Sequence, residues 1–218
     1  MIHIKKYNKS YERWQDSLPP EKLQQIYDKI GWNSWRSIFV SDLEILITKH
    51  ETLRILDVGC FSGDYLQILI ERCSSFDYIG VDVTPGYIDF ARNRFSNIKC
   101  KNSQKFKFQT GNVFGLDFSD REFDVVMCTG LLHHLPELEK PLSEIARVCS
   151  KDMLFGVYIH DEQKEEIRNV KNGFLYKTWN EEFIIGEITK VANVKSVEKY
   201  KSPNYEYHHC SVIASKNS

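Results

Sequence analysis

The stretch LRILDVGCFSGDYL, residues Leu53 to Leu66, decides the fold of this chain. Its first six residues form a short, nearly continuous apolar run, which is typical of a strand buried on both faces of a parallel sheet. Gly59 and Gly63 follow, and then a helical pattern begins. A strand, a glycine turn and a helix in this order begin an open α/β sheet, in which ligands bind beyond the carboxyl ends of the strands. Phe61 stands between the two glycines, so the question is which ligand such a turn holds.

Short apolar runs alternate with stretches long enough for crossover helices along the rest of the chain. This alternation predicts an α/β fold with a Rossmann-like, doubly wound, mostly parallel sheet of about seven strands, covered by helices on both faces. The last two runs are joined by a turn at residues 202–204, which predicts an antiparallel last strand at one edge. Besides the first strand, the predicted strands are YIGVDV (78–83), KFKFQT (105–110), FDVVMC (123–128), DMLFGVYI (152–159), VKSVEKYKS (194–202) and YEYHHCSVIAS (205–215).

Amphipathic helices are predicted before and within this sheet. The segment ELEKPLSEIARVCS (137–150) repeats apolar residues at helical spacing, with Pro141 in its first turn. Ahead of the first strand, residues 19–30 and 34–50 also have helical patterning. We therefore expect an N-terminal helical cap or lid over residues 1–50 and a single main domain over residues 51–218. The aromatic side chains that such a lid could close over a ligand are Tyr7, Tyr11, Trp14, Trp32 and Trp35.

The amino-acid composition limits the classes of function that are expected. The chain has 218 residues, 42% of them hydrophobic, and a formal net charge of -1 with scattered basic residues. Duplex nucleic acid is therefore not an expected partner. The six cysteines include no CxxC pair, which indicates a reducing, cytoplasmic compartment. No apolar stretch approaches about 20 residues, so neither a signal sequence nor a membrane span is expected.

The glycine turn excludes some ligands. A dinucleotide site needs a central glycine so that the backbone can approach a pyrophosphate, and Phe61 occupies that place. No Gly-Lys-Ser/Thr follows the strand, so a Walker-type phosphate loop is absent. A nucleoside ligand without a pyrophosphate remains. Asp82, at the end of the second predicted strand, can accept hydrogen bonds from both ribose hydroxyls. In the alternative, Gly59 and Gly63 are ordinary turn glycines and Asp82 caps a helix before Pro85.

Four motifs carry a family resemblance: LDVGCFSG (56–63), GVDVTP (80–85), GNVFGLDF (111–118) and FDVVMCTGLLHHL (123–135). In this order and spacing they resemble the class I S-adenosylmethionine-dependent methyltransferases, over roughly Leu53 to Ala214. The resemblance implies S-adenosyl-L-methionine (SAM) as cofactor and S-adenosyl-L-homocysteine (SAH) as product. It also implies that Asp82 holds the ribose. The further cofactor-binding residues that it implies are Asp57, Gly59, Cys60, Phe61 and Gly63 around the methionine part, Val83, Asn112 and Val113 around adenine, and Thr129.

Two of these positions depart from the family pattern. Asn112 stands where the family more often has Asp, although its amide oxygen can still accept from the adenine amino group. Phe61 replaces the usual middle glycine, which implies a changed fit around the amino-acid end of the cofactor.

Candidate catalytic residues lie at the ends of the fourth and fifth predicted strands. A methyl group on a sulfonium is already activated, so the protein mainly aligns the acceptor and removes its proton. His133 and His134 are candidate bases, and His134 is favoured by analogy with related small-molecule methyltransferases. Tyr158 and His160 are candidates for binding the acceptor. The alternatives are that the histidines are structural, that Tyr158 belongs to the core and that HDEQKEEIRN (160–169) is an exposed acidic helix.

The favoured function is a methyltransferase acting on an oxygen or nitrogen atom of a small molecule: a sugar, a nucleotide-sugar or another metabolite. Phe174, Tyr176 and Trp179 could line its acceptor pocket. An RNA or protein methyltransferase is the alternative enzyme, but the motif Asn/Asp-Pro-Pro-Tyr/Phe and a basic extension are missing. A non-catalytic nucleotide-binding module is the third possibility. No metal is expected, because His133 and His134 lack partner ligands at zinc-like spacing.

Overall fold

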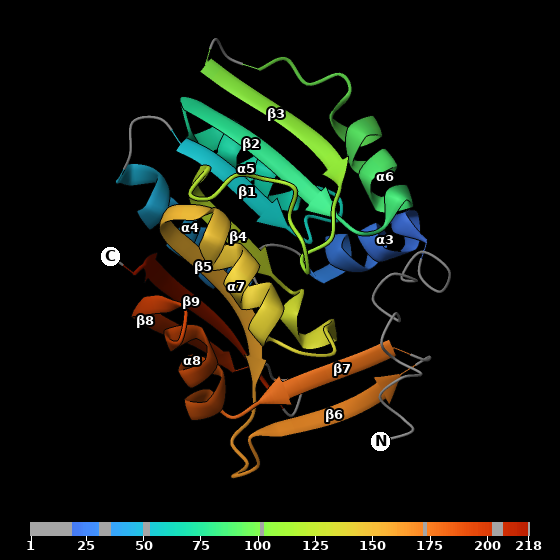
Figure 1. Cartoon of the computed structure of the whole chain (residues 1–218). Helices are drawn as coiled ribbons and strands as arrows, with labels where there is room; N and C mark the ends of the chain where they lie inside the picture. Colours follow the sequence, from blue (N-terminus) through green and yellow to red (C-terminus); the bar gives the residue numbers. More distant parts are fainter. Residues whose placement is uncertain are drawn as a thin grey trace.

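The structure is a computed structural model that describes residues 19–30, 36–49, 53–100, 103–171, 174–201 and 207–217. A central twisted sheet runs through the molecule, with helices on both of its faces (Figure 1). Among the described residues, nine strands join this sheet. They are β1 (Leu53–Val58), β2 (Ser75–Asp82), β3 (Ser103–Thr110), β4 (Phe123–Thr129), β5 (Cys149–Ile159), β6 (Glu166–Lys171), β7 (Phe174–Trp179), β8 (Ala192–Lys201) and β9 (His208–Lys216).

The strand order confirms the predicted doubly wound sheet. Strands β3, β2, β1, β4 and β5 are neighbours in that order, and all four pairings are parallel. Strand β9 then pairs antiparallel with β5, and β8 pairs antiparallel with β9. The chain order reverses between β1 and β4, and this is the switch point beyond which an open α/β sheet binds its ligand.

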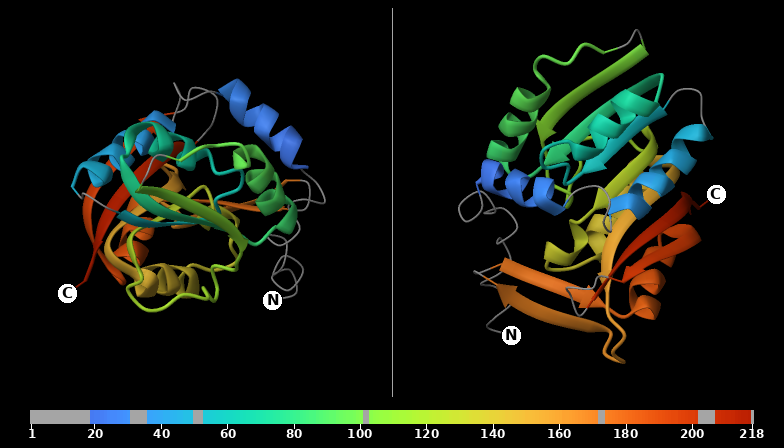
Figure 2. Two further views of the ribbon diagram at one scale, coloured as in Figure 1. Left: turned by 90° about the horizontal axis from the view of Figure 1, so that it is seen from above. Right: turned by 180° about the vertical axis from the view of Figure 1, so that it is seen from behind.

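Helices lie over both faces of the sheet, as the views from above and behind show (Figure 2), and each face has its own hydrophobic core cluster. One core cluster joins the sheet to α4 (Arg36–Thr48), α5 (Asp64–Arg72) and α6 (Pro85–Phe95). The other joins it to α7 (Glu139–Val148) and α8 (Glu181–Thr189). The predicted helices before the first strand are confirmed as α3 (Pro20–Ile30) and α4. None of the described helices has the length and apolar character needed to cross a bilayer.

Strands β6 and β7 form a hairpin that the sequence did not predict. Residues 161–165 are bends and Glu166–Lys171 is a strand, so the prediction of an exposed acidic helix over 160–169 is wrong. The segment is extended because all six residues of β6 pair antiparallel with β7. Strand β7 in turn pairs with the end of β5 in parallel register, through Ile159 and Trp179. Trp179 is fully buried.

Some predictions concern residues that the structure does not describe. The turn at residues 202–204 lies outside the described residues. So do the five aromatic side chains proposed for a lid: Tyr7, Tyr11, Trp14, Trp32 and Trp35.

Candidate active site

The glycine turn after β1 is held against β2. The backbone N–H groups of Gly59 and Cys60 both donate to the carbonyl of Val81, over 2.8 and 3.0 Å. Gly59 and Gly63 have φ values of 79° and 73°, which is left-handed backbone that glycine adopts at little cost. A Cβ atom on Gly63 would also lie 2.7 Å from the ring of Phe108. Both glycines are therefore required by the turn itself.

Phe61 fits the centre of the turn because its ring points away from the turn. Its backbone is left-handed, with φ 46°, a conformation that costs a residue with a Cβ about 1–2 kcal/mol. The ring packs edge-on against Tyr87, with centroids 4.8 Å apart, and stacks near Phe90 at 6.2 Å. Both partners belong to α6. The left-handed backbone leaves the Phe61 N–H directed at Asp82.

Asp82 ends β2 with its carboxylate fixed by backbone groups. Oδ1 accepts from the Thr84 N–H over 2.9 Å, and Oδ2 accepts from the Phe61 N–H over 3.2 Å. Burial raises the pKa of this carboxyl to about 6, although these hydrogen bonds oppose the shift. The group is therefore mostly ionised at pH 7, and each oxygen keeps acceptor capacity for a ligand hydroxyl.

Asp57 and Cys60 lie with their side chains beneath the turn. Asp57 is buried in β1 and accepts a hydrogen bond from the Tyr78 hydroxyl over 2.8 Å. Burial raises the pKa of Asp57 to about 7. The Cys60 thiol packs in the core cluster with α5 and α6, and burial raises its pKa well above the usual value. The protonated thiol is a packing group, so contact between Cys60 and a ligand would come from its backbone.

The loop after β3 lies beside Asp82. The Gly111 N–H donates to the backbone carbonyl of Asp82 over 3.0 Å. Asn112 follows, and its Oδ1 accepts from the Phe114 N–H over 3.0 Å, which fixes the loop and leaves one lone pair of the oxygen. Val113 is buried and Val83 packs partly buried against the same core cluster. The structure therefore brings the predicted adenine-binding residues to the same strand ends as the predicted ribose-binding residue.

The histidine loop follows β4. Thr129 ends the strand, Gly130 turns the chain with φ 75°, and the short helix η2 (Leu132–His134) comes next. His134 is partly exposed, whereas His133 is only 2% exposed. The Nδ1 atom of His133 is buried and has no hydrogen-bond partner among the described residues. Burial lowers the pKa of His133 well below its usual value, so this imidazole is neutral at pH 7.

Six rings gather around this loop, and we call them the aromatic cluster: His133, His134, Tyr158, Tyr176, Tyr207 and His209. Tyr158 is central, with ring centroids 4.1 Å from His133 and 4.6 Å from His209. The hydroxyl of Tyr176 donates to the hydroxyl of Tyr207 over 2.7 Å. The cluster thus joins the histidine loop, the end of β5, the β6–β7 hairpin and the start of β9. Burial also lowers the pKa of His209, to about 4.

A buried lysine fixes the hairpin to the histidine loop. Lys177 is 1% exposed, and its Nζ lies 3.0 Å from both Oε2 of Glu166 and the carbonyl of Pro136. The Trp179 indole N–H donates to the same Oε2 over 3.0 Å. Since Pro136 lies two residues beyond His134, the hydrogen bond from Lys177 joins the strand that carries Tyr176 to the loop that carries the histidines.

His160 lies at the rim but outside the aromatic cluster. Its ring atom Nδ1 accepts from the backbone N–H of Glu162 over 3.2 Å, and the backbone N–H of His160 donates to the carbonyl of Trp179 over 2.8 Å. Nε2 of His160 is buried without a hydrogen-bond partner in the described part of the chain. His208 pairs instead with Asp161, over 2.9 Å. The described residues include no cluster of potential ligands that could hold a metal ion.

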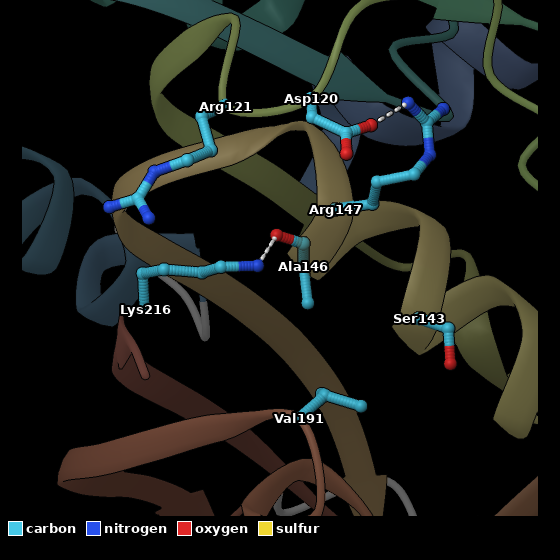
Figure 3. Close-up of a pocket in the computed structure, with 7 residues that line it drawn as sticks. All are labelled: Asp120, Arg121, Ser143, Ala146, Arg147, Val191 and Lys216. Carbon is cyan, nitrogen blue, oxygen red and sulfur yellow. Dashed lines mark hydrogen bonds and ion pairs between the residues drawn. The ribbon is translucent and has the colours of Figure 1, made fainter. Parts of the chain in front are cut away.

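A separate hollow lies near the last turn of α7 (Figure 3). It contains none of the predicted site residues. Two groups of its lining stabilise the end of the helix: the Lys216 ammonium donates to the carbonyl of Ala146, and the backbone N–H of Arg121 donates to that of Arg147. Arg147 also pairs with Asp120. This hollow is therefore explained by helix capping.

The sequence missed three residues of the site. Tyr207 and His209 were not expected near the histidine loop, because β9 reaches it only through antiparallel pairing with β5. Lys177 was missed because lysine is rarely buried, and only the pairing of β6 with β7 brings Glu166 to it.

The fold is an open α/β sheet with a glycine turn and Asp82 at its switch point, and comparison with known proteins gives its family. Residues 49–207 match a protein family described as "Methyltransferase domain". The chain belongs to this methyltransferase family, and the prediction of a class I methyltransferase that uses SAM is confirmed at this level.

Individual relatives agree with the family. A sterol 24-C-methyltransferase of Clavispora lusitaniae is 31% identical over 130 residues, which cover 57% of this chain and 34% of that protein. A demethylmenaquinone methyltransferase of Leptospira interrogans is 29% identical over 145 residues, covering 62% and 55%. The chain thus spans well under two thirds of the length of either relative. The fold resembles magnesium protoporphyrin IX methyltransferase of Synechocystis with bound SAM, at TM-score 0.70, 13% identity and 97% coverage of both chains.

Proposed function

We propose that this protein transfers a methyl group from SAM to an oxygen or nitrogen atom of a small molecule. The observation that carries the proposal is Asp82, whose carboxylate is held by two backbone N–H groups at the end of β2, directly beside the glycine turn. A fixed carboxylate at this point suits the two hydroxyls of an adenosyl ribose.

The residues present fit the cofactor. The Phe61 ring lies on α6 and leaves the backbone of the turn to approach the methionyl part. Gly59, Cys60, Phe61 and Gly63 would make these backbone contacts, and Asp57 would support the turn from below. Val83, Asn112 and Val113 would hold the adenine, where the Asn112 amide oxygen keeps a lone pair for the adenine amino group. Thr129 would lie near the sulfonium end.

The sulfonium supplies an activated methyl group. When bound, SAM would give this methyl group to a lone pair of the acceptor, and the electron pair of the broken carbon–sulfur bond would stay on sulfur. The acceptor then loses its proton, and a neutral imidazole is a suitable base. His134 is the first candidate because it is partly exposed beside the strand ends, and His133 is the second. Tyr158 and His160 would contact or position the acceptor from the end of β5.

A small molecule is favoured over RNA or protein as the acceptor. The net charge of -1 gives little attraction for a phosphate backbone. The relatives' names also denote small acceptors, namely a sterol, demethylmenaquinone and magnesium protoporphyrin IX. The sterol enzyme methylates a carbon by its name, so the choice of oxygen or nitrogen rests on the histidine pair of this chain.

We also propose that residues 1–50 form a cap and residues 51–218 the catalytic unit, in a reducing, cytoplasmic setting. Helix α4 supports the catalytic unit directly. Its Phe39 ring lies against Gly156 of β5, and its Asp42 accepts a hydrogen bond from the Ser211 hydroxyl of β9.

Two measurements test the function. Calorimetric titration with SAM and SAH should give one site per chain, and absence of binding would refute the proposal. Tritium-labelled SAM should then be incubated with separate panels of hydroxylated or aminated small molecules, total tRNA and protein extract. Label should enter the small-molecule fraction, and label confined to tRNA or protein would establish the alternative.

A further inference from the structure

The side chains of the aromatic cluster form one continuous surface around Tyr158, which we call the wall. The Tyr158 ring is within 30° of parallel to those of His133, Tyr176 and Tyr207, at centroid distances of 4.1, 5.6 and 5.0 Å. These rings come from η2, β7 and the residue before β9. Relative to one another they are tilted, since the Tyr176 ring makes angles of 59° with His133 and 50° with Tyr207. The near-parallel, partly exposed pair is Tyr158 and Tyr176, at 29°, and phenol rings of this kind stack favourably on a flat unsaturated ligand.

The outer surface of this wall is accessible. The side chains of His134, Tyr158, Tyr176 and Tyr207 are partly exposed, whereas His133 and His209 are buried behind them. A molecule that enters at the ends of β4 and β5 would therefore meet phenol and imidazole faces.

The two buried imidazoles of the wall are also uncharged. Burial keeps both His133 and His209 neutral at pH 7 by lowering their pKa values. Lys177 follows Tyr176 in the chain, but its ammonium is compensated by Glu166. A phosphate or carboxylate would gain little here, which disfavours a nucleotide-sugar.

One buried atom in the cluster indicates a polar ligand group. Nδ1 of His133 has no hydrogen-bond partner among the described residues, and an unsatisfied buried polar atom costs about 1–3 kcal/mol. The rings of His134 and Tyr176 cover His133 and are themselves partly exposed. A modest rotation of these two side chains would open Nδ1 to a hydroxyl or N–H group.

We propose that the methyl acceptor is an uncharged molecule with a flat unsaturated ring, which stacks on Tyr158 and Tyr176 and hydrogen-bonds Nδ1 of His133 through a hydroxyl or N–H group. This inference rests on the proposed function and narrows its acceptor class.

The test uses the full chain saturated with SAH and 1-naphthol as the probe, with calorimetry or saturation-transfer NMR as the readout. Decahydro-1-naphthol has the same skeleton without the flat ring and should bind at least tenfold more weakly. Uridine diphosphate glucose, a charged sugar probe, should also bind at least tenfold more weakly. Equal or tighter binding of either compound, or no binding of 1-naphthol at millimolar concentration, would overturn the inference.

Variants locate the site. Tyr176→Ala should weaken 1-naphthol at least tenfold while SAH affinity stays within twofold, and Tyr176→Leu should do the same if the alanine variant folds poorly. Tyr65→Ala, on α5 and outside the cluster, is the matched control and should change neither affinity. The unaltered protein should prefer 1-naphthol over 1-methoxynaphthalene, because only the former can donate a hydrogen bond to Nδ1 of His133. His133→Phe keeps a flat ring and should abolish this preference.

The outcomes separate the two proposals. If SAH itself fails to bind, the proposed function fails. If SAH binds normally but Tyr176→Leu leaves 1-naphthol affinity unchanged, or His133→Phe leaves the preference intact, only the acceptor assignment is wrong.

Discussion

The backbone N–H of Phe61 donates to Oδ2 of Asp82 over 3.2 Å, and this bond ties the glycine turn to the end of β2. The bond exists because Phe61 is left-handed and its ring is held by Tyr87 and Phe90. A large residue at the centre of the turn therefore orders the carboxylate that we assign to the ribose.

Asp82→Ala should weaken SAM binding at least tenfold, because a carboxylate hydrogen bond contributes about 1.5–3 kcal/mol. Calorimetry measures the affinity, and circular dichroism checks that the fold is intact. Asp89→Ala is the control, since Asp89 lies exposed on α6 and pairs only with Arg92 among the interactions described. Unchanged affinity in Asp82→Ala would remove the ribose assignment.

His134→Ala should lower turnover about 10²–10⁴-fold, the usual contribution of a general base, and should leave SAM affinity within twofold. The acceptor found in the labelled-methyl screen serves as substrate. His208→Ala is a suitable control because His208 pairs with Asp161 outside the aromatic cluster. A rate close to that of the unaltered protein would return His134 to a structural role.

Asp57→Asn should become more stable relative to the unaltered protein as pH rises. Because the folded pKa of Asp57 is raised from 3.8 to about 7, the folded state binds more protons than the unfolded state between these values. The contribution of Asp57 to the free energy of unfolding therefore falls as pH rises across this window, by about 1.4 kcal/mol per pH unit, and levels off above pH 7.

Urea unfolding at pH 5, 6, 7 and 8 measures this difference. The comparison must be made between the two proteins, because His133 and His209 have lowered pKa values and their contributions change in the opposite direction. A constant stability difference between pH 5 and 7 would contradict the raised pKa of Asp57.

Lys177→Met should destabilise the protein by about 3–5 kcal/mol, because it removes the cationic partner of the mostly buried Glu166 carboxylate, which keeps the uncharged Trp179 indole N–H. Adding Glu166→Gln should recover part of the loss. Lys199→Met removes an exposed ion pair with Glu181 and should cost no more than about 1 kcal/mol. Urea denaturation of all three variants measures the free energy of unfolding. Equal losses for Lys177→Met and Lys199→Met would contradict a stabilising role for the buried Lys177–Glu166 ion pair.

NAD should give no thermal shift at concentrations where SAM raises the melting temperature. The turn lacks the middle glycine that lets a backbone press against a pyrophosphate, and Phe61 occupies its place. Stabilisation by NAD as large as that by SAM would show that the turn tolerates a dinucleotide.

The sequence predicted the central sheet well because its signals are local. The run Leu53–Val58 is apolar except for Arg54 and Asp57, and it is a strand over the predicted residues. The β6–β7 hairpin was not predicted, because the acidic segment 160–169 has helix-forming residues. From Glu166 onward, however, this segment pairs with β7. Tertiary pairing outweighed local propensity there, and the same pairing placed Tyr176 and Lys177 in the site.

The ring contacts of Tyr207 and His209 could not be predicted for a similar reason. These residues follow Tyr158 by about fifty positions, and only the register of β9 on β5 sets His209 opposite Tyr158. In contrast, the Gly59–Gly63 turn and Asp82 were recognisable from the sequence. They follow or end two successive strands joined by one helix, and such strands are neighbours in a parallel sheet.

The β6–β7 hairpin meets β5 through a single residue pair, Ile159 with Trp179, while β5 is paired along its length with β4 and β9. Trp179 and Lys177 are therefore the main anchors of the hairpin, and the remainder of it is an exchangeable module. A different hairpin could be grafted between β5 and α8 and bring a new acceptor preference, while the cofactor half of the molecule went on working unaltered.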